Sequence, residues 1–183
     1  GGNYLYHYYQ FKDSEYDLGS TNLTISNINA GGDINEYSMS VSVVCKNNIS
    51  ILNGFAGSGK TASTQGLIKM LKDNNKTFKL LSPTGRAAKV LTENTNEQAS
   101  TIHRGLGYVP PNQWTYNEWQ KLHTDIVIVD EFSMVDIWLF KKLLDAIDFR
   151  HTKLLLIGDN AQLPSVSCGN LLHDFSERFV STK

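Results

Sequence analysis

Cysteine is scarce in this sequence: Cys45 and Cys168 are the only two, and neither belongs to a CxxC pair. A disulfide framework or a zinc site of paired cysteines is therefore not indicated, and a reducing cytoplasm is the expected compartment. Long apolar runs are missing as well, because no stretch approaches the roughly 18 residues that a membrane-spanning helix needs. The N-terminus has no basic segment followed by an apolar stretch, so neither a secretory signal nor a membrane partner is expected.

An excess of charge is also absent, since 17 basic residues face 18 acidic ones and the formal net charge is −1. Nucleic-acid binding would therefore need a local basic face rather than a positive field over the whole protein. With 183 residues, 40% of them hydrophobic, the chain is long enough for one compact domain with a core. This composition excludes a coiled coil, a collagen and a disordered tail.

Residues 1–40 differ in character from the rest of the chain. They hold one basic residue and five acidic ones, and five tyrosines crowd into residues 4–16 before a Ser, Thr, Asn and Gly-rich stretch over 20–32. We predict that residues 1–40 are the end of an upstream element plus a linker, followed by a separate domain over 41–183. The tyrosines could stack on the bases of a single strand, but without interleaved Lys or Arg the favoured interpretation is packing.

Short apolar, β-branched runs alternate with longer segments of helical period from residue 49 onward. This pattern predicts an α/β fold with a mainly parallel sheet built from βαβ units, whose strands are covered on both faces. The predicted strands are residues 49–52, 77–81, 126–129 and 153–157, and the predicted helices are residues 60–72, 86–93, 136–147 and 170–177. Residues 105–118, which contain Pro110 and Pro111, are predicted to be an irregular connection.

The strongest single motif is GFAGSGKT, which fits GxxxxGK[ST] at every fixed position between a predicted strand and a predicted helix. Glycines let the backbone turn its N–H groups onto phosphate oxygens, and the helix N-terminus favours an anion. Eight residues are thus expected to bind the phosphates of a nucleotide: Gly54, Phe55, Ala56, Gly57, Ser58, Gly59, Lys60 and Thr61. Lys60 would neutralise the β and γ phosphates, and Thr61 would offer its hydroxyl to Mg²⁺.

Two carboxylates, Asp130 and Glu131, directly follow the apolar run at residues 126–129. At the carboxyl end of a parallel strand they would face the same crevice as the phosphate loop. Asp130 suits a Mg²⁺ ion, and Glu131 is placed to orient and deprotonate a water that attacks the γ phosphate. A base beside the metal ligand favours hydrolysis over transfer to a small-molecule acceptor.

Gln162 follows the last predicted strand in the segment GDNAQLPSV. Its neutral amide can hydrogen-bond the γ phosphate or the attacking water without competing for Mg²⁺. We therefore group Gln162 with Lys60 and Glu131 as catalytic candidates.

Together these segments resemble the RecD-like branch of the superfamily 1 DNA helicases, which includes the exonuclease V alpha subunit. GFAGSGKT is similar to helicase motif I, LSPTGRAAKVL to motif Ia, STIHRGLGY to the next DNA-contacting block, VDEFSMVD to motif II and GDNAQLPSV to motif III. In motif II, Phe132 stands where the family usually has a small residue. The resemblance implies a P-loop NTPase with a RecA-like three-layer α/β sandwich.

The resemblance also implies a face that holds single-stranded DNA, mostly through its phosphates. Five residues of motif Ia and the following block would lie on this face: Pro83, Thr84, Arg86, Thr101 and His103. Arg86, Lys89 and Arg104 would supply the positive charge that such a face needs.

By the same resemblance, the chain is expected to be the first RecA-like motor domain of an ATP-dependent, 5′ to 3′ DNA helicase. The family's second RecA-like domain would follow beyond Lys183. ATP and Mg²⁺ are the implied cofactors, and single-stranded DNA and other subunits of a recombination or repair nuclease are the implied partners. Two alternatives stay open: the helicase domain of a conjugative relaxase, and a catalytically idle, nucleotide-gated DNA-binding module.

Overall fold

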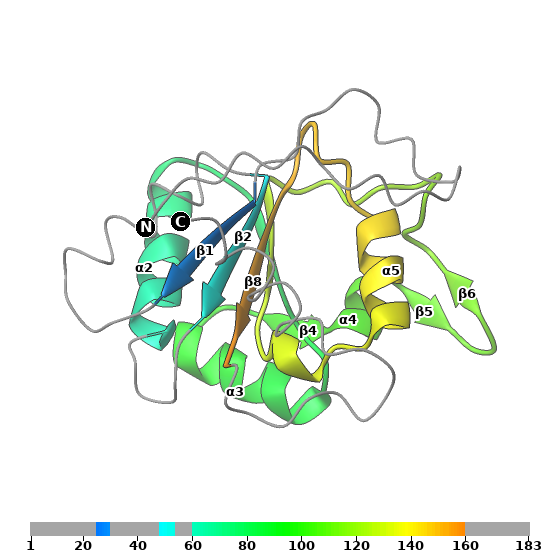
Figure 1. Ribbon diagram of the computed structural model, residues 1–183, viewed down its shortest axis with the longest axis horizontal. Coiled ribbons are helices and arrows are strands. Elements are labelled where there is room, and N and C mark those ends of the chain that lie inside the picture. The colour runs from blue at the N-terminus through cyan, green and yellow to red at the C-terminus, as the bar shows by residue number, and fades with distance from the viewer. Residues whose placement is uncertain (1–24, 30–47, 54–59, 160–183) are drawn as a thin grey trace, which may run out of the picture.

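The centre of the protein is a parallel β-sheet, seen in a computed structural model that describes residues 25–29, 48–53 and 60–159 (Figure 1). The sheet has six strands in the order β1-β2-β8-β7-β3-β4, and every neighbouring pair is parallel. Across the sheet these are β1 (Ile25–Asn29), β2 (Ile49–Asn53), β8 (Lys153–Gly158), β7 (Ile126–Val129), β3 (Phe78–Ser82) and β4 (Ala99–Thr101). All six strands therefore end at the same edge of the sheet.

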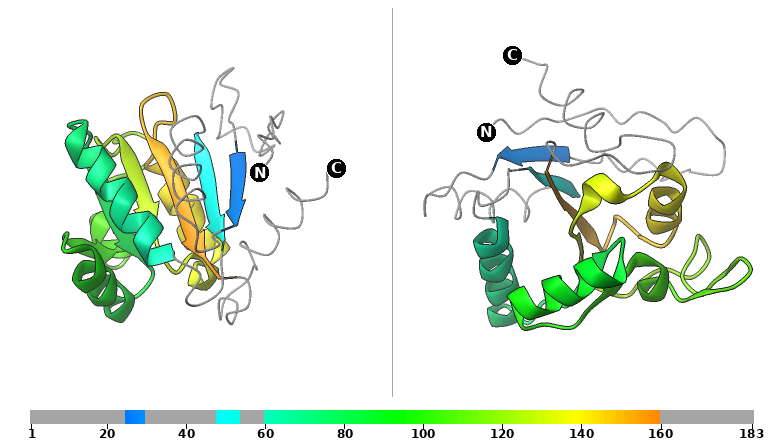
Figure 2. Two further views of the ribbon diagram at one scale, coloured as in Figure 1. Left: turned by 90° about the vertical axis from the view of Figure 1, so that its left-hand side faces the viewer. Right: turned by 90° about the horizontal axis from the view of Figure 1, so that it is seen from below.

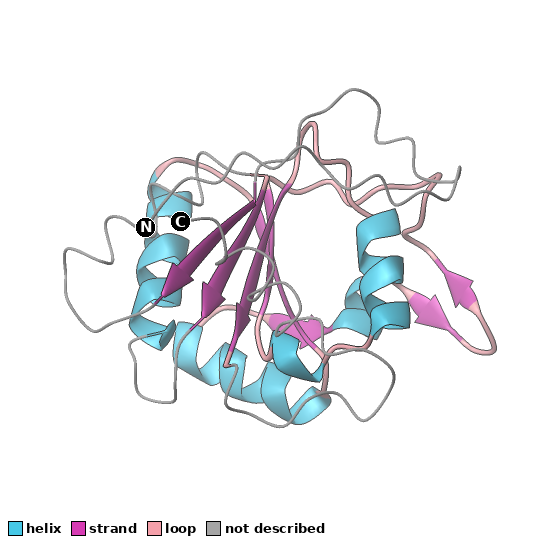
Figure 3. Ribbon diagram, viewed as in Figure 1, coloured by secondary structure: helices cyan, strands magenta, loops and turns pink. Residues whose placement is uncertain are grey.

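Helices cover both faces of this sheet, which makes three layers (Figures 2 and 3). On one face, α2 (Lys60–Asp73) and α3 (Gly85–Thr95) contribute leucines and isoleucines to one hydrophobic core. On the other face, α4 (Ile102–Gly105), the short 3-10 helix η1 (Phe132–Met134) and α5 (Ile137–Asp145) pack into a second core. The predicted α/β three-layer architecture is confirmed.

Alternation along β7 explains why this central strand is apolar at every position. In β7, Ile126 and Ile128 point into the core under α2 and α3, whereas Val127 and Val129 point into the opposite core. All four side chains are buried. A strand covered on both faces needs no polar side, as a parallel sheet between helix layers requires.

The predicted strands at 49–52, 77–81, 126–129 and 153–157 are confirmed to within one residue at each end. Helices at 60–72 and 86–93 are confirmed with slightly different ends. The helix expected over 136–147 is shorter and spans Ile137–Asp145; Asp136 caps its start by accepting a hydrogen bond from the amide of Leu139. The helix predicted at 170–177 lies outside the described residues.

Two expectations need correction. The stretch 20–32, predicted to be linker, contains β1, which pairs with β2 and joins the sheet. Its Ser and Asn content hid a strand that lies at the sheet's edge. The connection 105–118, predicted to be irregular, contains a hairpin of β5 (Tyr108–Val109) and β6 (Gln113–Trp114), which projects beside α4 (Figure 1).

Phe132 is fully buried, and its ring meets that of Phe140 edge to face, with the centroids 5.3 Å apart. Phe132→Ala should therefore lower the free energy of unfolding by about 3–5 kcal/mol, the range for large core truncations. Urea unfolding followed by circular dichroism measures this loss. Trp138→Ala is the matched control, because Trp138 is 70% exposed. A loss below about 1 kcal/mol at Phe132 would contradict its role as a core anchor.

None of the helices within the described residues has the length and apolar character that a membrane span requires.

Candidate nucleotide site and nucleic-acid interface

The chemistry-bearing residues lie where the central strands end. The order β2-β8-β7 places the end of β8 between the other two. Lys60 opens α2 after β2, Asp159 follows β8, and Asp130 and Glu131 follow β7. Because the strands are parallel, these four residues come from three adjacent carboxyl ends and share one crevice.

Lys60 points across the end of β8. Its Nζ donates a hydrogen bond to the carbonyl oxygen of Gly158 at 3.5 Å and lies 4.0 Å from Asp159 Oδ2. Asp159 is only 4% exposed, so its carboxylate is one of the few buried charges in the described chain. Buried carboxylates need cations or hydrogen-bond donors nearby, and the Lys60 ammonium meets part of that need.

Asp159 is the site residue that the sequence reasoning missed. In the segment GDNAQLPSV, the sequence analysis gives a role to Gln162 and none to Asp159. The signal that could have found it is the carboxylate directly after an apolar strand, the same signal that identified Asp130. Its contact with Lys60 depends on β8 lying next to β2, which periodicity does not predict.

The acidic pair has an unusual backbone. Asp130 accepts a hydrogen bond from the amide of Glu131 at 2.9 Å, and its own amide donates to Leu81. Glu131 has φ 55° and ψ 39°, the left-handed region that non-glycine residues rarely adopt. Such a conformation costs of order 1–3 kcal/mol and is found most often at functional sites. This turn directs Glu131 differently from a regular continuation of β7.

Burial raises the pKa of both carboxyls, and for Glu131 the neighbouring negative charges raise it further. For Asp130, burial is the largest influence and raises the pKa, whereas the hydrogen bond from the Glu131 amide and the positive charge of Lys60 lower it. For Glu131 burial again comes first, then Asp130; Lys60 acts in the opposite direction, and Asp159 raises the pKa further. A carboxylate with a raised pKa is a stronger base, which suits proton abstraction from water near neutral pH.

Two buried hydroxyls lie beside the acidic pair. Ser82 ends β3 next to β7, and Ser133 lies two residues after Glu131; neither hydroxyl has a hydrogen-bond partner among the described residues. Unsatisfied buried hydroxyls are uncommon and fit a site that is completed by water, an ion or a ligand. Within residues 48–53 and 60–159, no cluster of three or more His, Cys, Asp or Glu could hold a metal unaided. A Mg²⁺ ion on Asp130 and Thr61 would thus need further oxygens, which nucleotide phosphates and water provide.

Seven of the predicted site residues lie outside the described part of the chain. These are Gly54, Phe55, Ala56, Gly57, Ser58, Gly59 and Gln162. Their roles stay predictions. Lys60 and Thr61 begin α2 directly after this loop, with Lys60 half-buried and Thr61 exposed.

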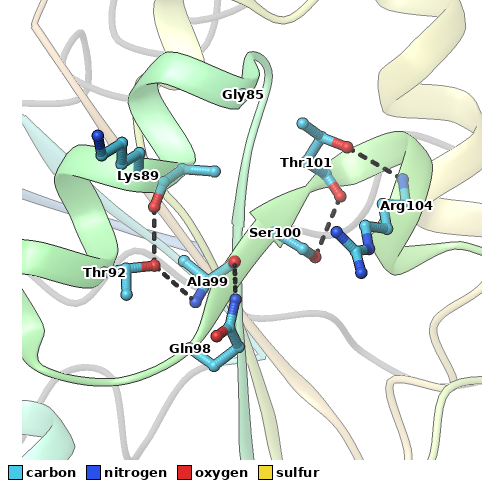
Figure 4. A pocket seen from close by; sticks show the side chains of 9 residues that line it. Gly85, Lys89, Thr92, Gln98, Ala99, Ser100, Thr101 and Arg104 are labelled. Atoms are coloured by element: carbon cyan, nitrogen blue, oxygen red, sulfur yellow. Dashed lines mark hydrogen bonds between the residues drawn. The ribbon is translucent and has the colours of Figure 1, made fainter.

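A second hollow, with a volume of about 310 Å³, opens between α3 and the β4–α4 segment (Figure 4). Lys89 of α3 and Arg104 of α4 bring positive charge to its two sides, with Thr101 beside Arg104. Both cationic side chains are exposed. The hollow is open, and the two cationic side chains on its sides fit an anionic ligand.

Of the five residues predicted to contact DNA, only Thr101 lines this hollow. Thr84 Oγ1 accepts a hydrogen bond from the amide of Ala87 at 3.2 Å and caps α3, and Thr101 Oγ1 does the same for Arg104 at 3.1 Å and caps α4. Pro83 is half-buried between β3 and α3, and Arg86 is exposed on α3.

His103, the fifth residue, contacts the rings of the β5–β6 hairpin. The helix caps made by Thr84 and Thr101 are a structural function that the sequence analysis does not assign, although Ser and Thr before a helix are preferred caps.

Comparisons with known proteins agree with this geometry. The family model described as an AAA domain matches residues 38–168. The RecD subunit of the RecBCD enzyme from Haemophilus influenzae is 33% identical over 164 residues, which is 76% of this chain and 26% of that protein. The ATP-dependent RecD2 DNA helicase of Deinococcus radiodurans is 38% identical over 119 residues, 65% of this chain and 16% of that protein.

A RecD subunit from Buchnera aphidicola is 30% identical and covers 93% of this chain. The chain spans about a third or less of the length of each of these relatives. The family match covers well over half of the chain, and the matched region contains the phosphate loop, the acidic pair and Asp159. The chain therefore belongs to the RecD-like branch of the AAA-domain family.

Proposed function

We propose that this chain is an ATP-binding and ATP-hydrolysing motor domain of a DNA helicase that acts on single-stranded DNA. The observation that carries the proposal is the convergence of Lys60, Asp159 and the acidic pair at three adjacent strand ends. The hollow between α3 and the β4–α4 segment, with Lys89 and Arg104 on its sides, supports a DNA contact in the same domain.

In the proposed mechanism, backbone amides of residues 54–59 surround the phosphates of ATP and Lys60 neutralises the β and γ phosphates. Glu131 orients the attacking water and takes its proton, and Gln162 hydrogen-bonds the γ phosphate or that water. Thr61 and Asp130 are the residues that would hold Mg²⁺, which withdraws charge from the phosphates when bound. The hydrogen bond from the Glu131 amide fixes the Asp130 carboxylate in place.

On the proposed DNA face, Arg86, Lys89 and Arg104 contact phosphates. The helix caps made by Thr84 and Thr101 hold α3 and α4 in the orientation that presents these cations. Contacts of this kind position a strand without reading its sequence. The 5′ to 3′ polarity is proposed from the likeness to RecD-like helicases.

Partners are proposed on the same likeness. Two of the relatives are named as subunits of the RecBCD enzyme, which supports association with other subunits of a recombination or repair nuclease. The Deinococcus relative is named as a DNA helicase, and its name mentions no complex, which supports a motor that works without other subunits. Co-purification of the tagged chain from its source would distinguish these two.

ATP turnover that rises on addition of single-stranded DNA tests the proposal directly. It also decides against the catalytically idle module, which would bind both ligands without releasing phosphate. Unchanged turnover with DNA would contradict the coupling of the two faces.

The salt dependence of DNA binding tests the phosphate contacts. Replacing Arg104 with Gln should lower the slope of log K against log salt by about 0.7, the value for one phosphate contact on a single strand. Anisotropy of a labelled oligonucleotide, titrated at several salt concentrations, measures this slope. Lys76→Gln is the matched control, because Lys76 is an exposed cation that precedes β3 at the opposite edge. Equal slopes for wild type and the Arg104 variant would remove Arg104 from the interface.

A further inference from the structure

Three aromatic rings meet where α4 leads into the β5–β6 hairpin. The His103 ring lies 5.3 Å from the Tyr108 ring at an interplanar angle of 73°, and 5.5 Å from the Trp114 ring. The rings of Tyr108 and Trp114 are 4.7 Å apart, and these two residues pair directly across the hairpin. Centroid distances of about 4.5–7 Å with tilted or edge-on rings are the favourable geometry for aromatic pairs.

The cluster lies on a part of α4 that is itself held firmly to the sheet. Ile102 is fully buried, and a Cβ added to Gly105 would meet the Leu81 side chain at 2.3 Å, so α4 packs directly on β3. Between these two residues, His103 and Arg104 face outward and are exposed. The two neighbours differ in what they touch: Arg104 borders the basic hollow, whereas His103 touches the hairpin.

The hairpin returns to α4 through its own hydrogen bonds. The amide of Thr115 donates to the carbonyl oxygen of Gly107 at 3.2 Å, and that of Tyr116 donates to Leu106 at 3.1 Å. Gly107 has φ +67°, a conformation that turns the chain into β5 and suits glycine. These bonds fix the base of the hairpin, and the ring cluster lies directly beyond them.

Trp114 also touches the helix that follows the acidic pair. Lys142 Nζ of α5 lies 5.8 Å from the centroid of the Trp114 ring, within cation–π range, and Trp114 packs against the core that α5 completes. The chain runs from Glu131 through η1 into α5. The ring cluster therefore joins the hairpin both to α4 and to the helix after the nucleotide site.

We propose that His103 is a positioning residue that anchors the β5–β6 hairpin through its ring, and not a ligand of DNA phosphate. The inference refines the proposed DNA face, and only one arm of its test depends on DNA binding. Because packing of a flat ring holds the hairpin, His103→Phe should preserve the position of the hairpin. His103→Gln keeps a side-chain hydrogen-bond donor but has no ring, so this variant should release the hairpin.

The first arm of the test measures, in the absence of DNA, whether the hairpin stays packed. In the 183-residue chain with Trp119→Phe and Trp138→Phe, both exposed positions, Trp114 is the only tryptophan that emits. We expect His103→Phe to leave its emission maximum in place, and His103→Gln and His103→Ala to shift it to the red as the indole gains water. The same three substitutions at His151, an exposed histidine before β8, are the control and should cause no shift.

The second arm measures affinity for a labelled single strand. We expect His103→Phe to stay within about twofold of wild type, because no charged phosphate contact is removed. His103→Gln and His103→Ala should weaken binding together with the spectral shift. Retained affinity in His103→Gln with a loss in His103→Phe would identify His103 as a DNA ligand and overturn the proposal. An unchanged Trp114 emission in all three variants would also overturn the proposal, whether or not the chain binds DNA, because the hairpin would then not depend on the His103 ring.

Discussion

Glu131→Gln should leave ATP bound and slow its hydrolysis by about 100-fold or more, the usual contribution of a positioned base. Glutamine has the shape of glutamate but cannot accept the proton of the attacking water. In the folded protein, burial and the charges of Asp130 and Asp159 raise the pKa of Glu131, which makes its carboxylate a better base than an exposed one. Steady-state phosphate release gives the turnover, and calorimetry gives the ATP affinity.

The matched control for this variant is Glu118→Gln, an exposed glutamate in the connection after the β5–β6 hairpin. It should retain full turnover. Because Glu and Gln meet the same backbone strain at φ 55°, a loss of turnover with unchanged unfolding would be chemical in origin. Near-normal hydrolysis in Glu131→Gln would reduce Glu131 to a structural residue at the end of β7.

Lys60→Ala should abolish tight binding of Mg²⁺-ATP, with an affinity loss of about 100-fold or more. Charge-assisted hydrogen bonds to phosphate are among the strongest in proteins, each worth about 1.5–3 kcal/mol. Lys60 brings a positive charge to this crevice, where its Nζ lies 4.0 Å from Oδ2 of the buried Asp159. Calorimetric titration of ATP in the presence of Mg²⁺ measures the loss.

The control is Lys69→Ala, an exposed lysine on the same helix, which should bind ATP normally. Since Lys60 also lies beside a buried carboxylate, its removal lowers stability as well as affinity. Thermal unfolding of Lys60→Ala without nucleotide separates the two effects. Unchanged ATP affinity in a folded Lys60→Ala protein would contradict the phosphate-loop assignment.

The central strands and the acidic pair could be predicted because their signals are local. A run such as Ile126–Val129, apolar at every position and followed by two carboxylates, identifies both a strand buried on two faces and a polar strand end. Which strands lie beside Ile126–Val129 in the sheet could not be predicted from such a local signal. Asp159 became a site residue only because β8 lies between β2 and β7, and strand order depends on how the whole chain packs.

The sequence pattern also did not predict the short strands, for a different reason. Strands of two or three residues, such as Ala99–Thr101, contain too few positions for a period of two to appear. The β5–β6 hairpin is held by ring contacts and by hydrogen bonds to residues near α4, and these long-range interactions leave no periodic pattern. The ring contacts of His103 belong to the same long-range packing, so the sequence pattern around His103 does not predict them.

The pairing of β2 with β8 has a consequence for how the protein is made. Lys60 and Gly158 are 98 positions apart, and a ribosome adding about 5–20 residues per second needs roughly 5–20 s to travel between them. Throughout that interval the edge of β2 that β8 later covers has no partner strand, and such non-local pairing is slow to form. Three of the four site residues, Asp130, Glu131 and Asp159, also emerge late. On the proposed function, the complete nucleotide site forms only after β8 has paired with β2, so ATP binding would stabilise the folded domain rather than its early intermediates.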